Sequence, residues 1–159
     1  MICKLEKEKM QDRYLFKAKH FNEWHIGNLV KEPDGLYIRD INKNVMAFIN
    51  DESTICQCTG LKDKNSKLIW ENDIVRDAQG NFYAVFYYNN YYRFSWICVK
   101  SDVFLVGAMW NLWSFHSFEV EVIGNIFDNT ELLDTNIPND LDRHWLEKYT
   151  EKNDREKRD

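Results

Sequence analysis

Three carboxylates within a seven-residue window could carry chemistry: Glu71, Asp73 and Asp77. Paired carboxylates can act as acid and base, and they are also ligands that Mg²⁺ prefers. On an extended strand the side chains of Asp73 and Asp77 point to the same side, as such chemistry requires. Asp73, however, lies in a turn before Ile74 and Val75, where an aspartate usually accepts hydrogen bonds from backbone N–H groups. The pattern favours a structural role, and a carboxylate- or Mg²⁺-dependent enzyme is the alternative.

Thiols and imidazoles are the next groups that could bind a metal or react. Cys56 and Cys58 form a C-x-C pair with no histidine or cysteine partner at zinc spacing, so we expect ordinary buried thiols. Four histidines lack the spacing of a metal motif: His20, His25, His116 and His144. His20 and His25 could approach each other across a hairpin. The sequence also has no glycine-rich phosphate loop, and we predict no catalytic residue, metal or cofactor.

Aromatic side chains are abundant, with 24 Phe, Tyr and Trp among 159 residues, which is more than one small core usually hides. Around residues 87–93 they flank an arginine, a combination that can stack on single-stranded nucleic acid. Packing in the core and at a subunit interface is the competing interpretation, and we favour it. The candidate interaction surface comprises Tyr88, Tyr91, Arg93, Trp110, Trp113 and Trp145.

The charge distribution restricts the class of partner. The formal net charge is −5, and residues 32–138 carry eight Lys and Arg against fifteen Asp and Glu. Binding to duplex nucleic acid depends on neutralising phosphates with Lys and Arg, so a duplex-binding protein is not expected. No run resembles a signal peptide or a membrane span. We therefore expect a cytoplasmic protein with reduced thiols.

Period-two alternation and frequent turn residues predict that these side chains are placed on β-hairpins. We expect turns near residues 21–23, at the EPDG sequence of residues 32–35 and around residues 42–44. Residues 82–99 predict a hairpin with Asn89 and Asn90 in a two-residue turn, and both of its faces are apolar. In TGLKDKNSKLIWENDIV, residues 59–75, we expect two tight turns between three strands. Gly60 and Asn72 serve backbone geometry there, and Asn65 is the best candidate for a left-handed conformation.

The ends of the chain differ from its centre. Residues 1–12 are polar and are expected to be flexible. Trp110 and Trp113 are three residues apart, which suits a short helical turn. Residues 138–159 predict a C-terminal helix that carries Leu141, Trp145 and Tyr149 on one stripe. The strand-rich domain is therefore expected over residues 13–133.

Three blocks of this domain resemble the YopX-like family of phage and prophage proteins. They are YLFKAKHFNEWHIGNLV, CTGLKDKNSKLIWENDIV and VEVIGNIFDNTELL. The middle block is similar to the family pattern Y-T-G-L-K-D-K-N-G-K-x-I-Y-E-G-D-I-V, which is long and specific. The chain departs from this pattern at Ser66 and Asn72, where the family has glycine. Asn72 tolerates a positive φ, whereas Ser66 does so less well, so the first turn could differ in type.

The resemblance implies a mostly β fold with an SH3-like barrel over about residues 55–128, preceded by β-hairpins. It also implies a phage or prophage origin and a bacterial host cell, and it supplies no catalytic residues. We expect a non-enzymatic protein that acts through protein–protein contacts as a homo-oligomer. A single-stranded nucleic-acid-binding module and a carboxylate-dependent enzyme are the alternatives. The region around Trp110 and Trp113 and the C-terminal helix lie outside the shared pattern, so functions peculiar to this chain could reside there.

Overall fold

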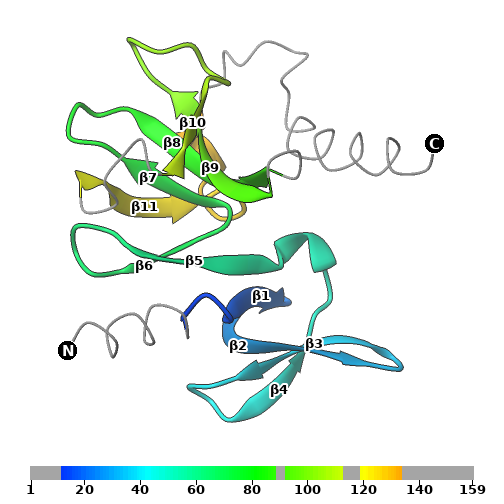
Figure 1. Cartoon of the computed structure of the whole chain (residues 1–159). Helices are drawn as coiled ribbons and strands as arrows, with labels where there is room; N and C mark the ends of the chain where they lie inside the picture. Colours follow the sequence, from blue (N-terminus) through cyan, green and yellow to red (C-terminus); the bar gives the residue numbers. More distant parts are fainter. Residues whose placement is uncertain (1–11, 89–91, 113–118, 134–159) are drawn as a thin grey trace, which may run out of the picture. The chain divides into compact units, whose positions relative to one another are not determined.

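The computed structural model describes residues 12–88, 92–112 and 119–133 of the chain. These residues form eleven β-strands and two 3-10 turns, and the strands make two antiparallel sheets (Figure 1). The chain divides into two compact units, Met1–Asn72 and Asp73–Asp159, each of which holds one sheet. The mostly β prediction is confirmed. The expected C-terminal helix, and the flexible N-terminus apart from Asp12, lie outside the described residues.

The first unit contains a six-stranded sheet in the order β4-β3-β2-β1-β5-β6. Its elements are β1 (Phe16–His20), β2 (Glu23–Glu32), β3 (Gly35–Asp40), β4 (Val45–Phe48), the 3-10 turn η1 (Glu52–Thr54), β5 (Cys56–Lys62) and β6 (Leu68–Trp70). The three predicted hairpin turns are confirmed, because His20 pairs with Glu23, Glu32 with Gly35, and Asp40 with Val45. Phe21 and Asn44 adopt the positive φ values of 52° and 54° that such tight turns require.

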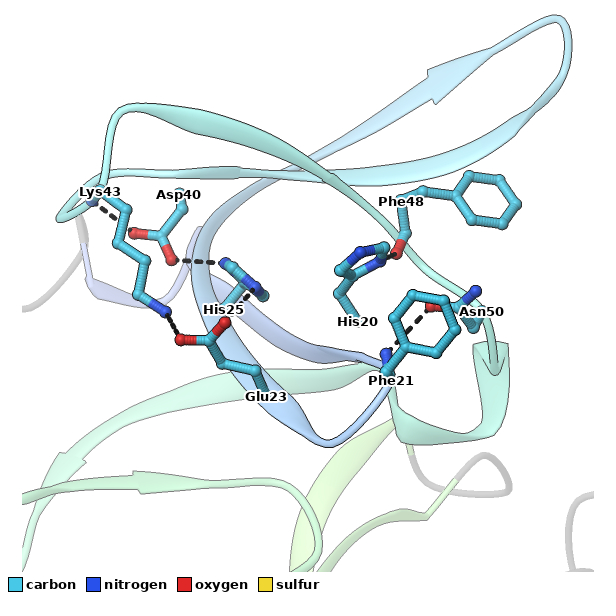
Figure 2. A network of polar contacts seen from close by, with 8 residues as sticks. All are labelled: His20, Phe21, Glu23, His25, Asp40, Lys43, Phe48 and Asn50. Carbon is cyan, nitrogen blue, oxygen red and sulfur yellow. Dashed lines mark hydrogen bonds and ion pairs between the residues drawn. The ribbon is translucent and has the colours of Figure 1, made fainter.

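This sheet bends strongly, so that the end of β1 meets the end of β4. Three strand spacings separate these two strands in the sheet order, which would be about 14 Å if the sheet were flat. Nevertheless His20 Nδ1 donates to the carbonyl oxygen of Phe48 at 2.8 Å, and the Phe21 N–H donates to Asn50 Oδ1 at 3.0 Å (Figure 2). Ala18, Ile38 and Ile49 are buried together in the core. The bend therefore lets a small unit enclose its own apolar core.

The stretch from residue 59 to residue 75 contains two tight turns, as predicted. Gly60 and Asn72 have φ values of 76° and 65°, which confirms their backbone roles. The residue with positive φ in the first turn is Ser66, at 65°, so the prediction of Asn65 was wrong. The turn is closed by Asp63, whose carboxylate accepts from the N–H groups of Asn65 and Lys67 at 2.8 and 2.9 Å. These two hydrogen bonds stabilise the left-handed conformation of Ser66, at a position where the YopX-like pattern has glycine.

The second unit contains a five-stranded sheet in the order β10-β9-β8-β7-β11. Its elements are β7 (Asp73–Arg76), β8 (Phe82–Tyr88), β9 (Arg93–Lys100), β10 (Met109–Asn111), β11 (Glu121–Asn125) and the 3-10 turn η5 (Thr130–Leu132). Ile74, Ala84, Phe86, Ile97 and Val99 form a buried cluster on one face. The expected barrel began near residue 55, whereas β5 and β6 belong to the first sheet. An SH3-like closure of the second sheet stays a prediction.

The long aromatic hairpin of β8 and β9 has the predicted faces but a different loop. Tyr88 pairs with Arg93, so four residues connect the strands and the predicted two-residue turn was wrong. The observed pairing differs from the predicted one by two residues, and because side chains alternate with a period of two, each stays on its predicted face. Val85, Trp96, Tyr87 and Phe94 therefore share one face. Most of the hairpin is buried on both faces, as its composition indicated.

Trp110 lies in β10, opposite Trp96 on β9. Trp110 is thus in a strand rather than in the helical turn that its spacing from Trp113 suits. The three-residue spacing of Trp110 and Trp113 was misleading at Trp110. This residue extends the sheet beside an aromatic strand, where cross-strand packing outweighs local spacing. Trp113 lies outside the described residues.

Candidate functional site

The predicted interaction surface is only partly described. Tyr91, Trp113 and Trp145 lie outside the described residues, and Tyr88 is placed only by its backbone, opposite Arg93. Arg93 is exposed at the end of β9. Arg93 and Trp96 are three residues apart on one strand, so their side chains point to opposite faces. Since Trp110 pairs with Trp96, the structure does not bring Trp110 and Arg93 to one face.

Trp110 is half-buried and packs edge-to-face against two other rings. Its ring centroid lies 5.6 Å from that of Tyr83 and 5.2 Å from that of Phe104. Such aromatic pairs stabilise a fold beyond their buried area. The contacts give Trp110 a packing role within the second unit and fix the start of the loop that precedes β10.

A polar cluster of the first unit contains a buried pair, His25 and Asp40 (Figure 2). His25 Nδ1 donates to Asp40 Oδ2 at 2.9 Å, and the two residues are 5% and 2% exposed. Asp40 Oδ1 accepts from the N–H groups of Asn42 and Lys43 at 2.8 and 2.9 Å. One carboxylate thus closes the turn between β3 and β4 and also orients an imidazole on β2.

The environment of Asp40 favours its ionised form. Burial raises the pKa of this carboxyl, but the N–H groups of Lys43 and Asn42 and the His25 ring outweigh burial. The net result is a pKa below the ordinary value. The carboxylate therefore stays charged at neutral pH, and it holds the proton of His25 on Nδ1.

The other nitrogen of His25 faces a second carboxylate. Nε2 is buried without a hydrogen-bond partner in the described part of the chain, and it lies 3.7 Å from Glu23 Oε2. Glu23 is itself paired with Lys43, and this ion pair lowers the pKa of Glu23. The result is a row of alternating groups, Asp40, His25, Glu23 and Lys43, that ties β2 to the turn after β3 (Figure 2).

An aspartate–histidine pair can serve a nucleophile, but this one has a different neighbourhood. The contacts of His25 within the described residues are with Asp40, Glu23 and the His20 ring, whose centroid is 6.2 Å away. The predicted approach of the two histidines is confirmed. No group of three or more His, Cys, Asp or Glu in the described residues has a metal-binding arrangement. The geometry therefore supports a structural network around His25 and Asp40.

Sequence inspection missed Asp40, although a signal was present. An aspartate directly before the polar turn INKN is a typical turn-capping residue. Its link to His25 spans fifteen positions and depends on the pairing of β2 with β3, which local patterns do not give.

Two of the three carboxylates considered for acid–base chemistry, Asp77 and Glu71, accept hydrogen bonds within the fold. Asp77 accepts from the N–H groups of Gln79 and Asn81, from Asn81 Nδ2 and from the Tyr83 hydroxyl. Glu71 Oε2 accepts from the Gln57 N–H at 3.3 Å. Asp73 is buried at the start of β7. Glu71 belongs to the first unit, whereas Asp73 and Asp77 belong to the second.

Three of the four cysteines are buried: Cys56, Cys58 and Cys98. Cys56 Sγ lies 3.3 Å from the carbonyl oxygen of Thr54 and 3.5 Å from Asn72 Nδ2. These contacts confirm the prediction of ordinary buried thiols for the described cysteines. Cys3 lies outside the described residues.

The comparisons with known proteins agree with the blocks of residues singled out in the sequence. No curated protein matches the chain. None of the helices in the described part of the chain is long and apolar enough to cross a membrane. The model of the family described as YopX protein matches residues 6–134, and the chain therefore belongs to the YopX family.

Proposed function

We propose that this protein is non-enzymatic and acts through protein–protein contacts as a homo-oligomer. The carrying observation is a group of large apolar side chains that the folded second unit exposes to water. Leu105 is 84% exposed and Val103 is 78% exposed, and both lie in the loop between β9 and β10. Exposed apolar clusters of this kind typically mark interaction surfaces.

Hydrogen bonds hold both ends of the loop that presents these side chains. Ser101 Oγ accepts from the N–H groups of Val103 and Phe104 at 3.0 and 2.9 Å. At the other end, Gly107 N–H donates to the Cys98 carbonyl at 2.8 Å, and Cys98 N–H donates to the Ala108 carbonyl at 2.9 Å. A loop fixed in this way loses little further entropy on binding, which favours association.

Light scattering on the intact chain tests the proposal. The chain has a mass of 19.2 kDa, and we expect a multiple of that mass at micromolar concentration. A chain ending at Asn136 should form an oligomer of the same number of copies if the contact lies on the sheet. Loss of the oligomer on truncation would place the contact on residues 137–159. A monomer for the intact chain across this range would contradict the proposal.

A second candidate function is binding of single-stranded nucleic acid by the β8–β9 hairpin. Tyr92 is 80% exposed next to the exposed Arg93, and the neighbouring rings of Tyr87 and Phe94 pack edge-to-face at 5.2 Å. Aromatic faces beside a cation can stack bases in any sequence. Fluorescence anisotropy with a labelled oligothymidine tests this candidate. Salt-sensitive binding that is lost in Tyr92→Ala would support it, and binding that is unchanged in this variant would contradict it.

The setting of this function is also a proposal. The YopX-like resemblance supports a phage or prophage gene and a bacterial cytoplasm, where the buried thiols Cys56, Cys58 and Cys98 would stay reduced. It also supports an SH3-like curvature of the second sheet. A structure of the oligomer would show how strongly this sheet curves.

A further inference from the structure

The two sheets have four edge strands, and three of them are protected against pairing with another strand. β11 has a bulge between Val122 and Gly124, and its Glu121 is paired with Arg76. β6 has only three residues, between Lys67 and Glu71. On β4 the Phe48 carbonyl already accepts from His20. Bulges, short strands, charges and capped carbonyls are the usual protections of a sheet edge.

The fourth edge, β10, is as short as β6, but within the described residues it has neither a bulge nor a charged residue beside it. Its register with β9 is regular over Met109, Trp110 and Asn111. Cys98 N–H donates to the Ala108 carbonyl, so this carbonyl and the backbone groups of Trp110 point toward β9, whereas the Ala108 N–H donates to the Leu105 carbonyl. The backbone N–H and C=O groups of Met109 and Asn111 therefore point away from the sheet. The edge presents a ready template for another strand.

The charge pattern of the sequence suits a second copy as the partner. Residues 103–118 contain no Asp, Glu, Lys or Arg, in a chain that is 30% charged. Two copies with a net charge of −5 repel each other, and this repulsion is weakest where the approaching surfaces are neutral. An antiparallel strand pair is also two-fold symmetric, as a closed dimer of identical chains requires.

We propose that β10 pairs antiparallel with β10 of a second copy about a two-fold axis centred on Trp110, which joins the two five-stranded sheets into one. This inference rests on the proposed function and names its surface. Met109 of each copy pairs with Asn111 of the other through outward backbone groups, and four hydrogen bonds form. The two Trp110 residues become a pair without mutual hydrogen bonds, in which side chains approach most closely. The exposed loop of Val103 and Leu105 lies next to this contact and extends it.

Sedimentation of full-length variants tests this surface. Met109→Pro removes an outward N–H without removing a bond to β9, so the variant's own sheet is retained. Met46→Pro is the matched control, because Ile49 N–H bonds to the Leu36 carbonyl and Met46 therefore also faces outward, on β4. The two methionines are equally exposed, at 40% and 41%. Leu105→Asp adds a charge to the neighbouring loop.

We expect Met109→Pro to raise the dissociation constant of the dimer by about 10- to 100-fold, since two of the four hydrogen bonds are lost. Leu105→Asp should also raise this dissociation constant, and Met46→Pro should leave it unchanged. Thermal melts of each variant check that the fold persists. An oligomer that survives both Met109→Pro and Leu105→Asp would overturn this surface and leave the proposed function standing. A monomeric wild-type chain would overturn both.

Discussion

At the residue scale, two non-glycine residues occupy left-handed positions that the family fills with glycine. Ser66 and Asn72 both have a φ of 65°. Asparagine tolerates this conformation better than serine, so the cost should be greater at Ser66. The turn at Ser66 is maintained by Asp63, which binds two N–H groups of the same turn.

Ser66→Gly should therefore stabilise the protein by about 0.5–1 kcal/mol, because it removes the left-handed strain. Asn72→Gly should be close to neutral, since it relieves less strain and loses the contact with Cys56 Sγ. Chemical denaturation of the two variants measures the difference. A destabilised Ser66→Gly variant would show that the serine hydroxyl contributes more than the strain costs.

The Asp40 carboxylate is the residue whose charge should matter most for acid stability. Its pKa is lowered in the folded state from an ordinary value of 3.8. A carboxyl with a lowered folded pKa stabilises the fold above the unfolded pKa, and this contribution is lost as the pH falls through the folded pKa. The melting temperature of the wild type should thus fall steeply below about pH 4.

Asp40→Asn should destabilise the protein by about 2–3 kcal/mol at pH 7, because an amide cannot accept from both the turn and His25 in the same way. The acid part of its melting profile should also be flatter than that of the wild type. Glu32→Gln, at an exposed strand end, is the control. A variant profile parallel to the wild-type profile between pH 2.5 and 7 would refute the role of Asp40.

At the element scale, the hairpin turns of the first unit were predictable because they depend on neighbouring residues. Pro33, Gly35 and Asn44 lie within four positions of the strands that their turns connect, so the local sequence determines these turns. The β8–β9 loop was misjudged by two residues, because the tolerance of asparagine for positive φ does not set loop length. The strand at Trp110 was missed for a related reason, since its partner strand β9 decides its conformation.

The close approach of β2 and β3 gives a prediction for Gly27. A Cβ atom at this residue would lie 1.8 Å from the Arg39 carbonyl oxygen, which belongs to the backbone of β3. Gly27→Ala should destabilise by about 3 kcal/mol or more, because the strand itself must shift.

Gly80→Ala is the matched control for this substitution. Gly80 has a φ of 88°, and nothing lies within 4 Å of an added Cβ, so only backbone strain of about 1 kcal/mol is expected. Thermal denaturation compares the two variants. Equal losses would mean that contact with Arg39 does not dominate at Gly27.

At the scale of the whole molecule, the sequence predicted a mostly β chain and buried thiols. It did not predict the division into two sheets at Asn72, because β5 joins β1 across about forty residues of chain. The buried His25–Asp40 pair escaped notice for the same reason. The candidate surface was chosen by residue type, whereas Arg93 and Trp110 prove to face opposite sides of the sheet. Long-range strand pairing decided each of these outcomes.

Self-association through neutral, apolar surface is the central claim, and amide hydrogen exchange on the intact chain tests it most directly. Exchange would be followed by NMR at two protein concentrations that bracket the dissociation constant. We expect the amides of Met109 and Asn111 to exchange at least about tenfold more slowly at the higher concentration, because pairing removes them from water. The outward amide of Met46 should exchange at the same rate in both samples. Rates for Met109 and Asn111 that are independent of concentration would contradict the account.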